Sequence, residues 1–316
     1  MQMRKMGKSL IEVAPLMFGG NVFGWTADEA TSFRLLDAFV ARGFNFIDTA
    51  DVYSAWVPGH EGGESETILG KWFRRSGKRN QVVIATKVGM ALGPLPGGLT
   101  KAYIMSSVEK SLKRLQVDCI DLYQSHKDDP ETPLEETLEA YARLIEQGKV
   151  RLIGASNYKG ERVREAVELA RRAGLPVYVT LQPEYNLYDR KDFEEDARPI
   201  AEELGLSVIP YSSLASGFLS GKYASKEDIA GTSREKRLGG YFNERGMRIL
   251  KSLREVANEV HAEPGAVALA WLIAQPTILA PIASATSLQQ LESNLQAAEL
   301  TLSGRQIGVL DEASAY

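Results

Sequence analysis

The sequence predicts a (β/α)8 barrel, a fold in which eight parallel strands alternate with helices around one axis. Short apolar runs of β type alternate with helical patterns along the chain, and several of these runs end in a polar, chemically useful residue. The runs number eight and span residues 16–18, 45–47, 82–85, 120–123, 150–153, 177–181, 206–209 and 278–282. With 316 residues, 44% of them hydrophobic, the chain can build one large core, so we expect one barrel domain over residues 1–316.

The segments on either side of the first strand carry turn residues. Residues 3–5 and 10–13 are predicted to pair as an N-terminal β-hairpin that turns at Gly7 and plugs the floor of the barrel. The glycine-rich stretch 18–24 only superficially resembles a dinucleotide-binding loop. Asn21 stands where that loop needs its second glycine, and no helix start follows at the proper offset. We therefore expect an ordinary loop there.

Two helices are predicted from apolar residues that recur with a period of about 3.6 residues. Their apolar stripes are Ile104, Val108, Leu112 and Leu115 in one, and Leu134, Leu138, Tyr141 and Ile145 in the other. Each stripe is expected to cover the barrel exterior. For the second helix we expect Thr132 as N-cap, Pro133 at the first helical position, Glu135 closing a capping box and Gly148 beyond the end.

The interval between the seventh and eighth strands is the longest, at about 70 residues. Within it, residues 213–243 carry five glycines and the charged run 233–237. This composition favours a mobile lid over a packed element, and a loop at this point of a barrel lies over its mouth.

Charge and cysteine content exclude several classes of partner. The net charge is only −4, from 37 basic and 41 acidic residues spread along the chain, which gives no footprint for nucleic acid or an anionic membrane.

Cys119 is the only cysteine, so no disulfide can form within the chain. Polar Ser9 and Glu12 interrupt the first apolar run before a signal sequence forms, and no stretch is apolar enough to span a bilayer. We expect a cytoplasmic protein that acts on a small molecule. The sequence carries no signal for an oligomeric state.

Four residues at or near the ends of consecutive strands suggest acid–base chemistry. Lys87 ends the third strand, where its ammonium is half buried and needs an anionic partner, which Asp48 can supply from the neighbouring strand. An ammonium beside Tyr53 is expected to lower the pKa of that phenol, which makes it a general acid. His126 ends the fourth strand and can donate a hydrogen bond to a carbonyl oxygen that gains charge during reduction.

A reduction needs an electron source, and the remaining strand ends are suited to a bound cofactor. Ser156, Asn157 and Gln182 offer hydroxyl and amide groups for a carboxamide, and Tyr211 offers a flat face for an aromatic ring. Nicotinamide has both features. The last helix of the barrel is expected to begin near Ser287, which would direct free backbone N–H groups and small hydroxyls at a phosphate.

Structural roles remain alternatives at several positions. A single Asp, Lys or His in a barrel is more often a structural group than a catalyst, but four at the correct strand ends favour catalysis. Tyr211 can also be plain core, and Trp25 and Trp56, in loops at the mouth, are either walls of the substrate pocket or packing residues. The charged run 233–237 is either a solvated face or a phosphate clamp. For His60 and His261 we expect a solvated or packing role rather than a metal-binding role.

Several stretches together identify a family resemblance. They are FNFIDTADVY at 44–53, GGESETILG at 62–70, VVIATKVG at 82–89, DLYQSH at 121–126, GKVRLIGASNY at 148–158, LQPEYNL at 181–187, IPYSSLASGFLSGKY at 209–223 and QQLESNL at 289–295. The chain resembles the aldo-keto reductase superfamily from the N-terminal hairpin to the last helix. By this resemblance the catalytic tetrad corresponds to Asp48, Tyr53, Lys87 and His126. The nicotinamide contacts correspond to Ser156, Asn157, Gln182 and Tyr211.

The resemblance also indicates the cofactor. Many members bind the 2′-phosphate of NADP with a lysine near Ser284 and an arginine near Gln290, and this chain has neither. It is more similar to the bacterial and potassium-channel β-subunit type, which uses hydroxyl and amide side chains plus basic residues of the long loop. On that pattern the cofactor set gains Ser212, Leu214, Gly217, Leu219, Lys222, Arg234 or Arg237, Ser284, Thr286, Gln290 and Asn294.

The resemblance therefore implies reversible NAD(P)H-dependent reduction of an aldehyde or ketone, with NADP(H) favoured and NAD(H) the alternative. The same fold and motifs also serve in regulatory or sensor subunits that hold the nucleotide and turn over slowly. A metal-dependent isomerase or lyase barrel is the remaining alternative, for which the sequence offers no ligand cluster.

Overall fold

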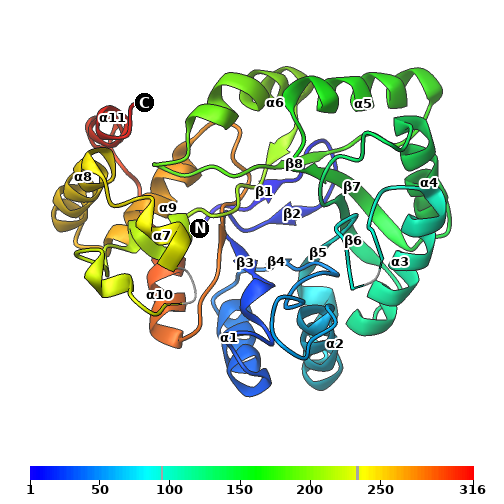
Figure 1. Ribbon diagram of the computed structural model, residues 1–316, viewed down its shortest axis with the longest axis horizontal. Helices are drawn as coiled ribbons and strands as arrows, with labels where there is room; N and C mark the ends of the chain where they lie inside the picture. The colour runs from blue at the N-terminus through cyan, green and yellow to red at the C-terminus, as the bar shows by residue number, and fades with distance from the viewer. Residues whose placement is uncertain (94, 233–234) are drawn as a thin grey trace.

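A computed structural model describes residues 1–93, 95–232 and 235–316, and in these residues the predicted barrel is confirmed (Figure 1). Its sheet is parallel throughout and has the order β10-β3-β4-β5-β6-β7-β8-β9. The strands are β3 (Met17–Gly19), β4 (Phe46–Asp48), β5 (Val83–Val88), β6 (Ile120–Ser125), β7 (Val150–Ser156), β8 (Thr180–Gln182), β9 (Ser207–Val208) and β10 (Ile282–Ala283).

The ring closes between β9 and the segment that leads into β10. Leu279 N donates to Val208 O at 2.8 Å, and Ile282 N donates to Pro210 O at 2.9 Å. The strand predicted at 278–282 is therefore paired over most of its length, but only its last residue belongs to β10. Pro281 has no N–H to donate, which interrupts the ladder.

The N-terminal hairpin plugs the barrel floor, as predicted. β1 (Arg4–Lys5) and β2 (Glu12–Val13) pair antiparallel. Met6 and Val13 are fully buried in one cluster with Met17 and Phe46, the first residues of β3 and β4. Because these residues begin their strands, the hairpin fills the end of the barrel opposite the polar strand ends.

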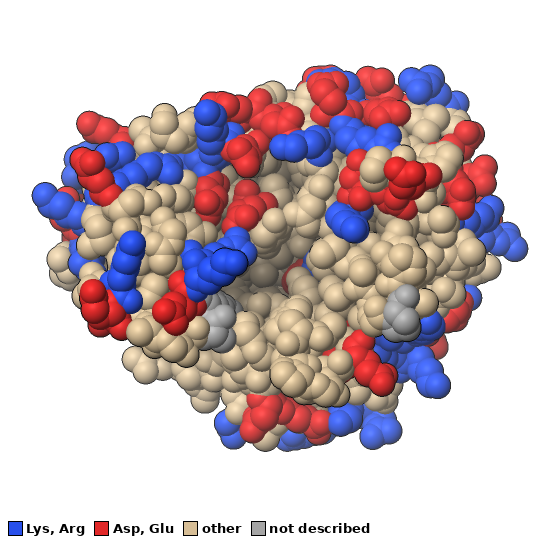
Figure 2. Space-filling model, viewed as in Figure 1, with Lys and Arg blue, Asp and Glu red and all other residues tan. Residues whose placement is uncertain are grey.

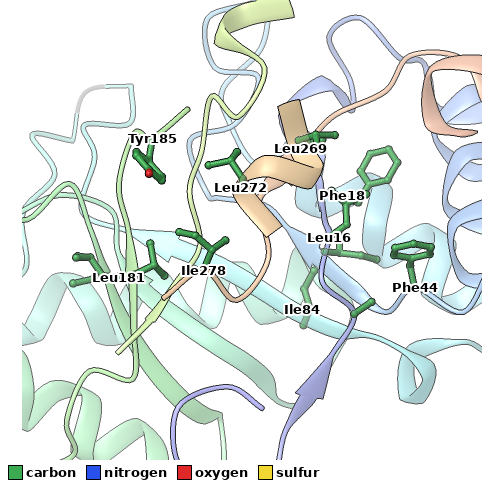
Figure 3. Packing of buried hydrophobic residues seen from close by; sticks show 14 of the residues in the cluster. Leu16, Phe18, Phe44, Ile84, Leu181, Tyr185, Leu269, Leu272 and Ile278 are labelled. Atoms are coloured by element: carbon green, nitrogen blue, oxygen red, sulfur yellow. The ribbon is translucent and has the colours of Figure 1, made fainter. Parts of the chain in front are cut away.

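Helices cover the outside of the sheet (Figure 1). The α-helices of the described residues are α1 (Glu29–Ala41), α2 (Glu64–Ser76), α3 (Lys101–Leu115), α4 (Leu134–Glu146), α5 (Gly160–Ala173), α6 (Arg198–Leu204), α7 (Glu235–Gly239), α8 (Glu244–Val260), α9 (Pro264–Ala274), α10 (Leu288–Gln296) and α11 (Gly304–Ala313). Of these, α7 lies in the long segment after β9 and α11 packs on α8. Both predicted apolar stripes are buried apart from half-buried Ile145. Figure 3 shows Leu269 and Leu272 of α9 pointing towards Phe18 and Ile278 in the main core cluster. No helix within the described ranges is long and apolar enough to cross a membrane.

The predicted cap of α4 is wrong. The helix begins at Leu134 after Pro133 as its N-cap residue, and no side chain caps it. Thr132 Oγ1 instead donates to Asp129 Oδ2 at 2.7 Å, so this hydroxyl forms its hydrogen bond within the preceding loop. Gly148 does follow the helix, with a φ of 71° that suits glycine.

The described part of the segment 213–243 contains packed elements, where none was expected from the sequence. It forms short 3-10 helices at Ala215–Ser220 and Glu227–Ile229, followed by α7. Phe218 and Leu238 are fully buried, and the Phe218 ring stacks on Tyr241 with 5.4 Å between centroids. These apolar side chains anchor the segment, although its glycines and charges suggested mobility. Ser233 and Arg234 lie outside the described residues.

Candidate active site

A cavity of about 1660 Å³ lies at the carboxyl ends of the strands. Figure 2 shows it as a hollow at the centre of the face, with charged side chains on its left rim as drawn. Most residues predicted for the site line it: Trp25, Asp48, Tyr53, Trp56, His126, Ser156, Asn157, Gln182, Tyr211, Ser212, Leu214, Gly217, Lys222, Ser284, Thr286, Gln290 and Asn294. Leu219 and Lys87 do not line it, because both are fully buried, and Arg234 is outside the described residues.

Lys87, Asp48 and Tyr53 form one hydrogen-bonded unit, of which Asp48 and Tyr53 line the cavity and Lys87 is buried beneath them. Lys87 Nζ donates to Asp48 Oδ1 at 2.6 Å and to Thr49 O at 2.8 Å, and it lies 2.8 Å from the Tyr53 hydroxyl. The Tyr53 hydroxyl donates to Asp48 Oδ2 at 2.9 Å. Lys87 has no exposed surface, so Asp48 supplies the countercharge that a buried ammonium needs. The predicted pairing is present.

The predicted direction of the Tyr53 pKa is wrong for the protein alone. Burial raises the pKa of Tyr53 well above its ordinary value, and the charge and hydrogen bond of Asp48 add to this rise. Burial also lowers the pKa of Lys87, while Asp48 acts in the opposite direction. The neighbouring ammonium does not outweigh desolvation, because the negative Asp48 lies equally close. Tyr53 therefore keeps its proton near neutral pH.

His126 lies across from this unit. Its ring centroid is 6.0 Å from that of Tyr53, at an interplanar angle of 71°. Burial lowers the pKa of His126 well below its ordinary value, and the positive charge of Lys87 contributes. The imidazole is therefore neutral, and the one N–H that it carries can donate a hydrogen bond without adding a charge to the cavity.

Gln182 is connected to the same unit, and Asn157 and Tyr211 are connected to the backbone of His126. Gln182 Nε2 donates to Asp48 Oδ1 at 3.1 Å. Asn157 Nδ2 donates to His126 O at 2.8 Å, and Asn157 Oδ1 accepts from the Tyr211 hydroxyl at 2.7 Å. Asn157 adopts a φ of 57°, a left-handed conformation that asparagine tolerates better than most residues. The bonds orient the ring of Tyr211 at the cavity wall.

The other end of the cavity is formed by the loop before α10 and by the long segment after β9. α10 begins directly after Ser287, as predicted. Ser287 is its N-cap residue and accepts from Gln290 N, and Thr286 N donates to Gln290 Oε1 at 2.9 Å, so these two N–H groups are bonded within the loop rather than free. Lysine and arginine side chains from the long segment line this end: Lys222, Lys236 and Arg237. Arg237 forms an ion pair with Glu184 and donates to Ser212 Oγ at 3.2 Å. It therefore connects α7 to the segments that follow β8 and β9.

Two tryptophans form the aromatic side of the mouth. Trp25 and Trp56 pack edge to face, with 5.5 Å between ring centroids, and the Trp56 ring lies 6.2 Å from that of Tyr53. Both line the cavity, although Trp56 keeps 49% of its surface exposed. His60 and His261 do not line it. Within the described ranges, no group of His, Cys, Asp and Glu residues is arranged to hold a metal ion.

Sequence reasoning missed some residues of the site. Asn21 lines the cavity and accepts from Ser284 Oγ at 2.6 Å, although the stretch around it was expected to be an ordinary loop. A polar residue in the middle of a glycine run that follows a strand was the available signal. Glu184, the ion-pair partner of Arg237, lies within a stretch quoted for the resemblance but had no assigned role.

Comparisons with known proteins show the family of the chain. The profile of the Aldo/keto reductase family matches residues 15–315. The chain is 36% identical to "Uncharacterized oxidoreductase YrpG" of Bacillus subtilis (strain 168), over 99% of this chain and 95% of that protein. It is 32% identical to "Aldo-keto reductase str7" of Strobilurus tenacellus, over 97% and 90%. It is 33% identical to "Probable voltage-gated potassium channel subunit beta" of Oryza sativa subsp. japonica, over 95% and 92%. The chain belongs to the aldo/keto reductase family, a family of oxidoreductases.

Proposed function

We propose that this protein reduces an aldehyde or ketone to the alcohol with a nicotinamide cofactor, and that Tyr53 supplies the proton. The single observation that carries the proposal is the Tyr53 hydroxyl in the cavity, held by Lys87 Nζ at 2.8 Å and Asp48 Oδ2 at 2.9 Å. A phenol hydroxyl held in this way can give its proton to a substrate bound in the cavity once its hydrogen turns away from Asp48. The reverse oxidation of an alcohol uses the same groups.

The cavity fits a dinucleotide together with a small substrate. At about 1660 Å³ it exceeds the roughly 300–1,000 Å³ of a typical small-molecule site. The residues that would hold the nicotinamide are Ser156, Asn157, Gln182 and Tyr211, and those that would hold the rest of the cofactor are Ser212, Leu214, Gly217, Lys222, Ser284, Thr286, Gln290 and Asn294. Reduced nicotinamide supplies a hydride when bound. The basic residues at the phosphate end favour NADP(H), with NAD(H) the alternative.

The protein's own residues then divide the work. The raised pKa of Tyr53, caused by burial and by Asp48, keeps the proton on its oxygen until the substrate oxygen becomes basic. To donate, the hydroxyl hydrogen turns from Asp48 towards the cavity, and the hydrogen bond from Lys87 stabilises the oxygen that is left. Neutral His126 orients the substrate carbonyl with its N–H. Trp25 and Trp56 exclude water and present an aromatic wall to the substrate.

The test is a carbonyl and alcohol panel with both NADPH and NADH. We expect steady turnover of at least one aldehyde or ketone, with NADPH preferred. Absence of cofactor oxidation with every carbonyl would overturn the proposal.

A second candidate is a nucleotide-binding regulatory subunit with slow turnover, which the 33% identity to a probable potassium channel subunit beta favours. Fluorescence titration together with the steady-state assay separates the two. Tight NADPH binding with turnover below about one per minute on the whole panel would favour the regulatory subunit.

A further inference from the structure

A second buried carboxyl, that of Asp51, lies next to the hydrogen-bonded unit of Lys87, Asp48 and Tyr53. Asp51 follows β4, is only 2% exposed, and its backbone N–H donates to Lys87 O at 3.4 Å. Its Oδ1 is buried and has no hydrogen-bond partner among the described residues. The hydroxyl of Tyr123, a fully buried residue of β6, is likewise unpartnered in the described part of the chain. A backbone hydrogen bond with Val52 favours the ionised form of the Asp51 carboxyl, but burial outweighs that bond, so Asp51 tends to hold a proton.

Ionisable groups face Asp51 from the surrounding elements. They are Glu66 of α2, Lys87 of β5, Tyr103 and Arg114 of α3, Tyr123 of β6 and Tyr141 of α4, and Asp48 of β4 lies against Lys87. The two cations are already committed. Arg114 Nε donates to Glu66 Oε2 at 2.7 Å, and Lys87 binds Asp48. Within the described residues, three carboxyls thus share two cations, and Asp51 is the carboxyl left without its own countercharge.

We propose that Asp51 is a positioning residue that acts through Lys87: a proton on Asp51 favours proton donation by Tyr53, and its loss opposes it. This inference rests on the proposed function. With Asp51 protonated, the cluster of Asp48, Asp51, Glu66, Lys87 and Arg114 is neutral. With Asp51 ionised, the cluster carries one excess negative charge. A second negative charge on Tyr53 is then harder to form, because like charges in a low-dielectric interior repel strongly.

The carboxyl of Asp51 gains or loses its proton in the pH range in which most enzymes work. Burial raises the pKa of Asp51 from 3.8 to about 7, and the charge of Glu66 adds to the rise. The pKa of Tyr53 is raised well above 10.0 by burial, and that of His126 is lowered well below 6.5 by burial. Neither of these two groups therefore changes charge near pH 7, where Asp51 does.

The test is the pH profile of kcat for carbonyl reduction at saturating cofactor and substrate. We expect wild-type kcat to fall about three- to tenfold as the pH rises through about 7, since one pKa unit corresponds to a factor of ten. Asp51→Asn should remove this fall and hold kcat at the acidic plateau, while Asp51→Glu should keep it. The matched control is Asp121→Asn. Asp121 is also 2% exposed, but Arg79 pairs with it at 2.8 Å and Arg151 at 3.2 Å, so its loss should leave the fall in place.

Thermal unfolding gives a readout that needs no activity. Because the folded-state pKa of Asp51 is raised, the folded protein keeps a proton that the unfolded chain has lost between pH 3.8 and about 7. Stability is therefore lost as the pH rises through this window. Asp51→Asn should raise Tm by more near pH 8 than near pH 5.

The outcomes separate the two proposals. An active wild type whose fall in kcat persists unchanged in Asp51→Asn overturns this inference alone, and so does an equal Tm change at both pH values. A wild type that reduces no carbonyl on the panel overturns the proposed function and, with it, the role of Asp51 in the reaction.

Discussion

Replacing Lys87 by methionine is the perturbation whose size follows most directly from the structure. Lys87 is fully buried and its Nζ makes hydrogen bonds of 2.6, 2.8 and 2.8 Å to Asp48, Thr49 O and Tyr53. Methionine is of similar length, so the substitution leaves little cavity but strands the Asp48 carboxylate without a countercharge. Breaking a buried ion pair in this way costs about 3–5 kcal/mol of unfolding free energy.

The assay is urea denaturation of a double-mutant cycle. If the cost arises from an uncompensated charge, adding Asp48→Asn to Lys87→Met should restore about 1–3 kcal/mol, although each single change destabilises. Acid should also shrink the loss in Lys87→Met, because a protonated carboxyl carries no charge. Costs that simply add in the double variant would refute the reasoning, since they would mean that Lys87 and Asp48 do not depend on each other for stability.

Three further predictions follow from single contacts. Arg237→Ala should raise the Kd for NADPH about tenfold and spare NADH if Arg237 binds the 2′-phosphate, and fluorescence titrations with equal effects on both cofactors would count against that role. Trp56→Ala should raise KM for aromatic aldehydes about two- to tenfold with little change in kcat, and an unchanged KM would exclude Trp56 from the substrate wall. Gly70→Ala would place a Cβ atom 2.1 Å from Arg114 O, so we expect a loss of about 1–3 kcal/mol in urea denaturation; a neutral effect would mean that α2 and α3 separate freely.

The barrel and the outline of the site were predictable because both depend on local patterns. Alternating apolar runs predicted the strands, and the carboxyl ends of parallel strands meet at one mouth, which brought Asp48, Lys87 and His126 together. Boundaries were less accurate where a local competitor decided them. Asp129 takes the hydroxyl of Thr132 that was expected to cap α4, and Pro281 shortens the last strand.

Properties that depend on depth of burial were not predictable from the sequence. The ammonium of Lys87 was expected to lower the pKa of Tyr53, but the direction is set by desolvation and by Asp48 on the other side of the hydroxyl. The charge of Glu66 adds to the rise in the pKa of Asp51, and the two carboxyls meet where the sheet packs against helices α2 and α3. No spacing in the sequence reveals such a contact. In the segment 213–243, the glycines and charged residues suggested a loop, and the burial of apolar residues such as Phe218 and Leu238 was not predicted.

The central claim is that Tyr53 gives its proton to the substrate oxygen, and single-turnover oxidation of bound NADPH by an aldehyde in Tyr53→Phe tests it most directly. Phenylalanine keeps the ring and removes only the hydroxyl. We predict that the rate falls by about 10²–10⁴-fold while the Kd for NADPH stays within about twofold of wild type. A Tyr53→Phe protein that binds NADPH and oxidises it at the wild-type rate would contradict the claim.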